Sequence, residues 1–158
     1  MLPFERYPGE GRRQLGLRRG ANARWEYGLQ LRRKTGETTC AYCGLDLFST
    51  YDRWLMLQVD HAVPTSVAKK LGVSFDLYED LFNLVLACAA CNGFDNRYGY
   101  VPDSAAEPEW TAEAFVSLRD KVFSERFERI AARHIIERAF FEKLPMLLAS
   151  TDALLGGD

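Results

Sequence analysis

Residues 83–92 read Asn-Leu-Val-Leu-Ala-Cys-Ala-Ala-Cys-Asn, so a short apolar run leads directly into a Cys-x2-Cys turn. The matching turn lies upstream as Cys40-Ala-Tyr-Cys43, and the chain has no cysteine besides these four. Two Cys-x2-Cys turns can place four thiolates in a tetrahedron around one zinc ion. Because sulfur would fill every position, we expect a structural zinc ion on Cys40, Cys43, Cys88 and Cys91 that performs no chemistry itself.

Disulfides and a redox-active Cys-x-x-Cys are the competing interpretations of these cysteines. We expect an intracellular (cytoplasmic) protein without a membrane span. Residues 1–10 carry charges and prolines instead of a secretory apolar region, and no apolar run approaches the roughly 20 residues that cross a bilayer. Thiols stay reduced inside cells, and a redox function would not require two copies of the motif. The sequence therefore favours zinc.

The apolar runs around the second cysteine pair predict two strands and a helix. Residues 54–59 form a short, bounded apolar run that predicts a strand, with Asp60 and His61 at its C-terminal end. Residues 83–87 predict a second strand, and a helix is expected to begin within residues 88–92. Since successive side chains of an extended chain point to opposite sides, Asp60 and His61 should face different ways.

The flanking segments predict further helices. Residues 22–34 favour a short helix ending before Gly36, although an alternation of apolar residues leaves a strand as the alternative. Residues 65–82 predict irregular structure with one or two short helices. Thr111 is the expected N-cap of an apolar pattern over residues 112–144 that is either one long helix or two with a break. This pattern is expected to stop near Pro145.

Composition and charge define the expected organisation of the 158-residue chain, whose net charge is −2. Residues 1–39 indicate either a phosphate-contacting arm or a solvated surface. They hold four acidic residues and nine basic ones: Arg6, Arg12, Arg13, Arg18, Arg19, Arg24, Arg32, Arg33 and Lys34. We predict an α+β protein with this basic N-terminal arm, a small zinc-containing core over residues 40–100, and a C-terminal helical extension over residues 109–150.

The order of the motifs adds information that no single motif carries. Asp60-His61-Ala-Val-Pro-Thr-Ser follows the first cysteine pair, and Asn83-Leu precedes the second pair, which Asn92 follows directly. In this order the sequence resembles the HNH endonuclease family, which has a ββα-metal fold. The resemblance runs over residues 40–97, a little over a third of the chain.

The resemblance implies roles that phosphodiester chemistry also supports. Hydrolysis needs a base that deprotonates water and a cation that neutralises charge on the phosphate. His61 is the expected base, and Asp60 and Asn92 the expected ligands of a catalytic Mg²⁺ or Mn²⁺ ion. In the family the residue at Asn83 braces the loop that aims the base. Arg97 stands where these proteins often carry a phosphate-binding Lys or Arg, so it is either a phosphate contact or a plain surface residue.

The other residues of interest in the sequence point less specifically to a function. Asn96 lies one helical turn after Asn92, which makes it a third ligand, a phosphate contact or a plain surface residue. His134 is expected to be a surface or packing residue, and Trp25, Trp54 and Trp110 core or interface residues. Compared with the family, the chain has an insertion over residues 68–80 whose acidic end is expected near the site.

The expected function is a metal-dependent endonuclease that hydrolyses phosphodiester bonds in DNA, with RNA as an open alternative. A second hypothesis is a non-catalytic, zinc-stabilised module that binds nucleic acid or protein. A third is a partner-dependent nuclease subunit of a defence or mobile-element system. The apolar stripe of the C-terminal helices must pack on the core, on a second copy of the chain or on a separate protein partner.

Overall fold

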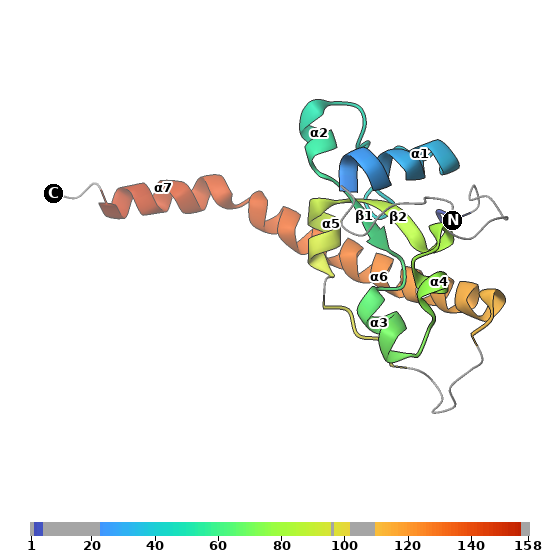
Figure 1. Ribbon diagram of the computed structural model, residues 1–158. Coiled ribbons are helices and arrows are strands. Elements are labelled where there is room, and N and C mark those ends of the chain that lie inside the picture. Colours follow the sequence, from blue (N-terminus) through green and yellow to red (C-terminus); the bar gives the residue numbers. More distant parts are fainter. Residues whose placement is uncertain (1, 5–22, 96, 102–109, 156–158) are drawn as a thin grey trace.

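The computed structural model describes residues 2–4, 23–95, 97–101 and 110–155. At its centre two strands, β1 (Leu57–His61) and β2 (Leu84–Cys88), pair antiparallel, and α5 (Ala89–Phe94) follows β2 directly (Figure 1). The pairing runs from Leu57 opposite Cys88 to His61 opposite Leu84. All five residues of β2 are buried, as its continuous apolar run requires. The predicted α+β class and the helix start after Cys88 are confirmed.

The first strand begins later than the sequence predicts. Helix α2 (Tyr51–Leu55) takes up Trp54, because Thr50 accepts a hydrogen bond from the Arg53 amide and caps a helix there. The prediction of a strand over residues 54–59 was therefore wrong in its first half. The strand still delivers Asp60 and His61 at its C-terminal end.

The helical prediction for residues 22–34 is confirmed from residue 23 onward, the first of them that the structure describes. A π-helical segment, η1 (Ala23–Gly28), continues into α1 (Leu29–Thr35). Gly36 ends the helix with φ 76°, a left-handed conformation that favours glycine, and its amide bonds the Arg32 carbonyl. Helix α1 lies beside the β1–β2 pair, with Leu31 fully buried against it.

The connection between the strands contains two short α-helices, as the sequence predicts, and a 3-10 helix in addition. They are α3 (Thr65–Lys70), α4 (Phe75–Tyr78) and the 3-10 helix η2 (Leu81–Asn83). Asn83 closes η2, so the second strand starts one residue later than predicted.

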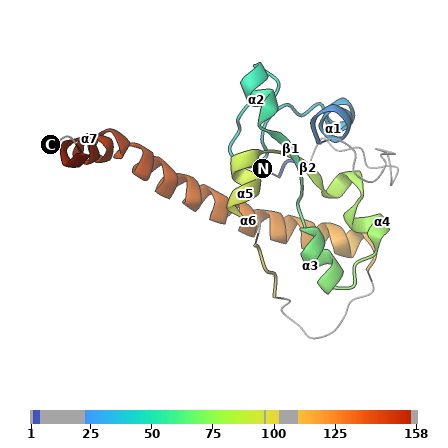
Figure 2. The same ribbon diagram turned by 60° about the vertical axis from the view of Figure 1, so that its left-hand side comes forward.

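The described C-terminal region, residues 110–155, contains two helices. Thr111 caps α6 (Ala112–Phe141) by accepting a hydrogen bond from the Ala114 amide, which confirms the predicted N-cap. The predicted stop near Pro145 was wrong. Helix α6 ends at Phe141, and α7 (Leu144–Leu155) carries Pro145 as its second residue, where the missing N–H costs no helical hydrogen bond. Figures 1 and 2 both show α6 crossing the core and α7 projecting away from it.

The first half of α6 joins two hydrophobic clusters. Phe123 and Ile130 pack against the strands and the first cysteine turn, while Phe115 and Val122 pack against α3 and α4. Phe4, near the chain start, is buried against Phe123 with a ring-centroid distance of 5.3 Å. The C-terminal extension is therefore part of the core over this half. Among the described residues, no helix has both the length and the apolar character that a bilayer crossing requires.

Candidate functional site

The four cysteines come together as the sequence predicts. Their sulfur atoms all lie within 4.8 Å of one another, and Cys43 Sγ and Cys88 Sγ are 3.8 Å apart. A zinc–sulfur bond of about 2.3 Å in a tetrahedron places sulfur atoms ~3.8 Å apart. All four are free thiols, and Cys40, Cys88 and Cys91 are buried. The group can therefore hold a structural metal ion such as zinc.

Short-range hydrogen bonds hold both cysteine pairs in place. Gly44, with φ 72°, closes the first turn through a hydrogen bond from its amide to the Cys40 carbonyl. The Ala41 amide donates to the Leu86 carbonyl and fixes the turn to β2. Cys88 ends β2 and caps α5, which brings Cys91 back to the same point one turn later.

The crowded thiols also favour a cation on electrostatic grounds. The contact with Cys40 lowers the pKa of Cys88, and the same contact raises the pKa of Cys40 to about 12. Contacts with both of these residues raise the pKa of Cys91. In this geometry, one thiolate is stabilised at the expense of its neighbours, so four thiolates together require a bound cation.

Asp60 lies in a buried ionic cluster. Its Oδ2 accepts hydrogen bonds from the Tyr42 hydroxyl at 2.6 Å and from Arg126 Nη2 at 2.8 Å. Burial, followed by the adjacent Asp60 charge, raises the pKa of Tyr42, so the hydroxyl stays protonated and donates. Within the described part of the chain, no further hydrogen bond reaches the carboxylate, so Oδ1 remains available as a ligand atom.

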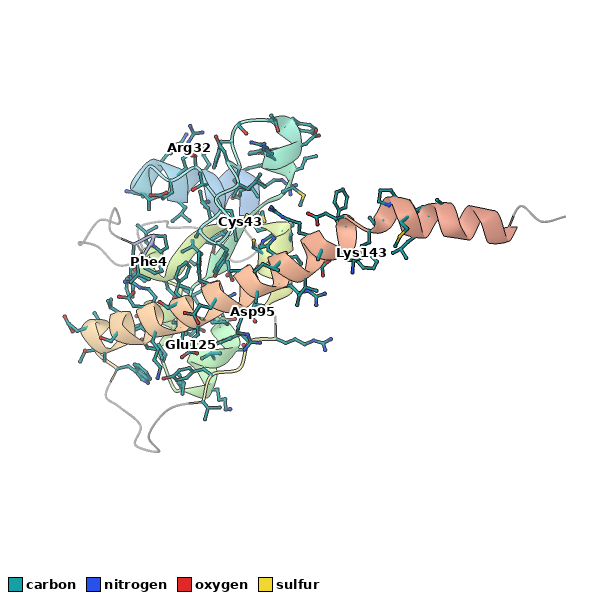
Figure 3. The ribbon with its side chains drawn as sticks, turned by 180° about the vertical axis from the view of Figure 1, so that it is seen from behind. Phe4, Arg32, Cys43, Asp95, Glu125 and Lys143 are labelled. Carbon is teal, nitrogen blue, oxygen red and sulfur yellow. The ribbon has the colours of Figure 1, made fainter. Side chains whose placement is uncertain are left out.

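Arg126 of α6 holds the end of β1 in place. Its Nη1 donates to the carbonyl oxygens of His61 (2.7 Å) and Ala62 (3.1 Å), and its side chain is only 2% exposed. Its Nε lies 3.4 Å from the buried Asp95 carboxylate. Asp95, which is labelled in Figure 3, follows α5. Burial alone lowers the pKa of a guanidinium, but Tyr42, Asp60 and Asp95 raise the pKa of Arg126, so the charge is retained.

His61 points to Glu79. The His61 Nε2 atom is buried and lies 3.3 Å from Glu79 Oε2, although not in the alignment of a hydrogen bond. This contact lowers the pKa of Glu79. The other ring nitrogen, Nδ1, is neither buried nor hydrogen-bonded among the described residues. Glu79, at the acidic end of residues 68–80, thus lies against His61, as the sequence suggests.

Asn83 is fully buried and joins three segments. Its Oδ1 accepts a hydrogen bond from the Val63 amide at 2.9 Å. Its Nδ2 donates to the carbonyls of Val63 at 3.1 Å and Tyr78 at 2.8 Å. Its backbone carbonyl accepts from the Ala62 amide. The loop that leaves His61 is therefore fixed by one asparagine at its start.

Asn92 lies on α5 above β1. Its Nδ2 donates to Gln58 Oε1 at 2.5 Å. Gln58 and Asp60 are two residues apart on the same face of the strand, roughly 7 Å along the chain. The structure thus brings Asn92 to the face that carries Asp60, with its Oδ1 unpaired among the described residues.

Of the two predicted phosphate contacts, Asn96 and Arg97, the structure describes only Arg97. Helix α5 ends at Phe94, so the helical spacing used to relate Asn96 to Asn92 does not extend that far, which corrects that argument. Asn96 itself lies outside the described residues. Arg97 is exposed in the following turn.

Of the nine basic residues in the N-terminal segment, the structure describes four, Arg24, Arg32, Arg33 and Lys34, and the last three are exposed on α1.

Sequence analysis missed residues that the fold brings to the site. Arg126 belongs to the buried stripe of α6, four residues from Val122 and from Ile130, and an arginine at a core position is a signal of a buried ion pair. His134, which the sequence predicts to be a surface or packing residue, has its Nε2 atom 3.0 Å from Cys91 Sγ. Trp25, expected in a core or interface, is 64% exposed.

Comparison of the chain with family models, with curated proteins and with solved structures found no match. The geometry of the residues therefore carries the functional argument alone. In the described part of the chain, the four cysteines are the one group of three or more His, Cys, Asp or Glu side chains arranged to hold a metal ion. A catalytic ion near Asp60 would consequently have few protein ligands and would rely on water and substrate.

Proposed function

We propose that this protein is an HNH-type endonuclease that hydrolyses phosphodiester bonds in DNA with a divalent cation. The observation that carries the proposal is the fixed end of β1. There, Asn83 fixes the loop after His61, and Arg126 holds the carbonyl of His61 and the carboxylate of Asp60. A histidine and an acidic residue are thus held rigidly beside each other, as a base and a metal ligand must be.

His61 is the proposed general base. Its Nε2 is enclosed beside the Glu79 carboxylate, which favours the tautomer with the proton on that nitrogen. Nδ1 then carries the lone pair and is the nitrogen open to a water molecule. A proton from the attacking water would pass to Nδ1, while Glu79 stabilises the imidazolium that forms.

Asp60 Oδ1 and Asn92 Oδ1 are the proposed ligands for Mg²⁺ or Mn²⁺. Both atoms are oxygens, as these hard ions prefer, and neither is used by the described part of the protein. A bound ion would supply neutralisation of the charge on the phosphate and the leaving oxygen. Arg97 and the exposed basic residues of α1 are the proposed contacts to the nucleic-acid backbone.

The test is cleavage of supercoiled plasmid by purified, zinc-loaded protein with Mg²⁺ or Mn²⁺. Metal-dependent nicking should fall about 10²–10⁴-fold in His61→Ala, with folding and zinc content unchanged. Reactions without added Mg²⁺ and with EDTA, followed by restoration of the ion, control for contaminating nucleases and for loss of zinc. Cleavage by His61→Ala near the wild-type rate would disprove the assignment of the base.

A non-catalytic, zinc-stabilised binding module is the second candidate. The observation in its favour is that Asp60 already has a buried cationic partner in Arg126, at 2.8 Å. If this pair is purely structural, zinc-loaded protein should retard a labelled DNA duplex without cleaving it in any divalent cation. Retention of binding in His61→Ala together with absence of cleavage in the wild type would favour this candidate.

Dependence on a protein partner is the third candidate. Large apolar side chains are exposed at the end of α6 and along α7, as partner-binding surfaces often are: Ile135, Ile136, Phe140, Phe141, Met146 and Leu148. An inactive isolated chain that becomes an active nuclease with a co-purified protein would favour this version of the proposal.

A further inference from the structure

Helix α6 makes a polar contact with the four-cysteine group. His134 Nε2 lies 3.0 Å from Cys91 Sγ, across a sequence separation of 43 residues. Cys91 is fully buried, and the His134 and Phe94 rings make an edge-to-face contact with centroids 5.0 Å apart. The ring is therefore held on one side by an aromatic contact while its nitrogen faces the sulfur.

The chemistry of a metal-bound cysteine fixes the direction of this hydrogen bond. A cysteine that binds zinc is a thiolate and has no proton to donate. The proton must then reside on His134 Nε2, which donates to the sulfur. Such outer hydrogen bonds draw charge from a ligand atom and fix its position, and their loss typically weakens metal binding 10–100-fold.

We propose that His134 is an outer-sphere residue of the structural metal centre, which donates a hydrogen bond to the metal-bound Cys91 thiolate and so fastens α6 to that centre. The cysteines supply the whole inner shell, so His134 acts through Cys91 and is a positioning residue. This inference is independent of the proposed nuclease activity, because it concerns metal retention alone.

The position of His134 on α6 gives the contact a wider consequence. Arg126, Ile130 and His134 follow one another at four-residue spacing and so share a face of the helix. Arg126 holds the Asp60–His61 end of β1. Ile130, which lies between Arg126 and His134 on the helix, is fully buried. One helix face thus joins the metal centre at one end of the strand pair to the Asp60–His61 end.

The test compares two variants of the full zinc-loaded chain by the transfer of zinc to a chromophoric chelator. His134→Phe keeps a ring against Phe94 but cannot donate, and it should lose zinc roughly 10–100-fold faster than the wild type. His134→Gln keeps an N–H donor and should lose zinc at a rate close to the wild type. Arg138→Phe, an exposed position one turn further on α6, is the matched control and should not change the rate.

Cobalt provides a readout that a change in packing alone would not move. In Co²⁺-substituted protein, the sulfur-to-cobalt charge-transfer band should shift in His134→Phe and keep its position in His134→Gln. Zinc loss at the wild-type rate by His134→Phe, or an unchanged cobalt spectrum in that variant, would overturn the inference. Equal acceleration of zinc loss by His134→Phe and His134→Gln would also overturn it, because the donor would then be irrelevant.

Discussion

The four-cysteine group and the Asp60–His61 site lie at opposite ends of the same pair of strands. Cys88 ends β2 opposite Leu57, whereas His61 ends β1 opposite Leu84. The cysteine group is assembled from two tight turns that contain their own ligands. The Asp60–His61 site is held by side chains from distant segments, above all Arg126, which is 66 residues from Asp60 along the chain.

This difference separates two ways of building a site. A Cys-x2-Cys turn fixes its two ligands through local backbone geometry, so half of the metal site forms within a few residues. The carboxylate of Asp60 is only useful when its charge is balanced and its orientation fixed, and both depend on α6 being packed in place. The cysteine group should therefore tolerate loss of Arg126 from α6, whereas the Asp60–His61 site should not.

The largest expected effect is at the cysteine group. Cys88→Ser should abolish cooperative folding, because structural zinc contributes about 10–16 kcal/mol and that free energy is also folding free energy. Chelation of zinc from the wild type should have the same effect. Circular dichroism during thermal unfolding, with zinc content measured on the same sample, checks this. A soluble Cys88→Ser protein that unfolds cooperatively without zinc would contradict the prediction.

Arg126→Leu should damage only the Asp60–His61 end of the strand pair. It leaves the Asp60 and Asp95 carboxylates buried without their shared partner, which should cost about 3–5 kcal/mol of stability. The protein should nevertheless bind zinc. Arg129→Leu is the matched control, since Arg129 is 56% exposed beside Asp95 and its loss should cost at most about 1 kcal/mol. Urea unfolding would measure both; equal costs would refute the buried-pair argument.

Asn83→Ala tests the loop that follows His61. The variant leaves the buried Val63 amide and two carbonyls without their partner, which should cost about 1–3 kcal/mol. Asn92→Ala removes a single, half-buried hydrogen bond to Gln58 and should cost less, about 1 kcal/mol. Denaturant unfolding provides the comparison. A larger loss in Asn92→Ala would show that the loop is not held by Asn83.

The smallest expected effect is that of Glu79→Gln. Contact with His61 lowers the pKa of Glu79, so the carboxylate stabilises the fold above its usual pKa of 4.5. This contribution should be below about 1 kcal/mol because the pair is partly exposed, and it should disappear as the pH falls through the lowered pKa. Stability measured between pH 3 and 7 should therefore converge for Glu79→Gln and the wild type at the acidic end. A constant difference would contradict this.

The parts of this protein that depend on short-range geometry were predictable from the amino-acid sequence. The spacing within each cysteine pair predicted a four-sulfur group, and the apolar runs predicted the two strands and the helix start after Cys88. The Thr111 cap was also predictable, because a cap needs only its own first turn. The nuclease assignment remains a prediction that rests on the order of these motifs.

The surroundings of Asp60, His61 and Cys91 depend instead on how distant segments of the chain pack together. No local rule relates Arg126 to Asp60 or His134 to Cys91, because residues so far apart meet only when α6 packs across the strand pair. The late start of β1 has a local cause instead: residues 54–59 are apolar enough for a strand, but the Thr50 cap extends a helix through Trp54. Charges buried by packing, and helices fixed by distant contacts, lie beyond what periodicity and spacing encode.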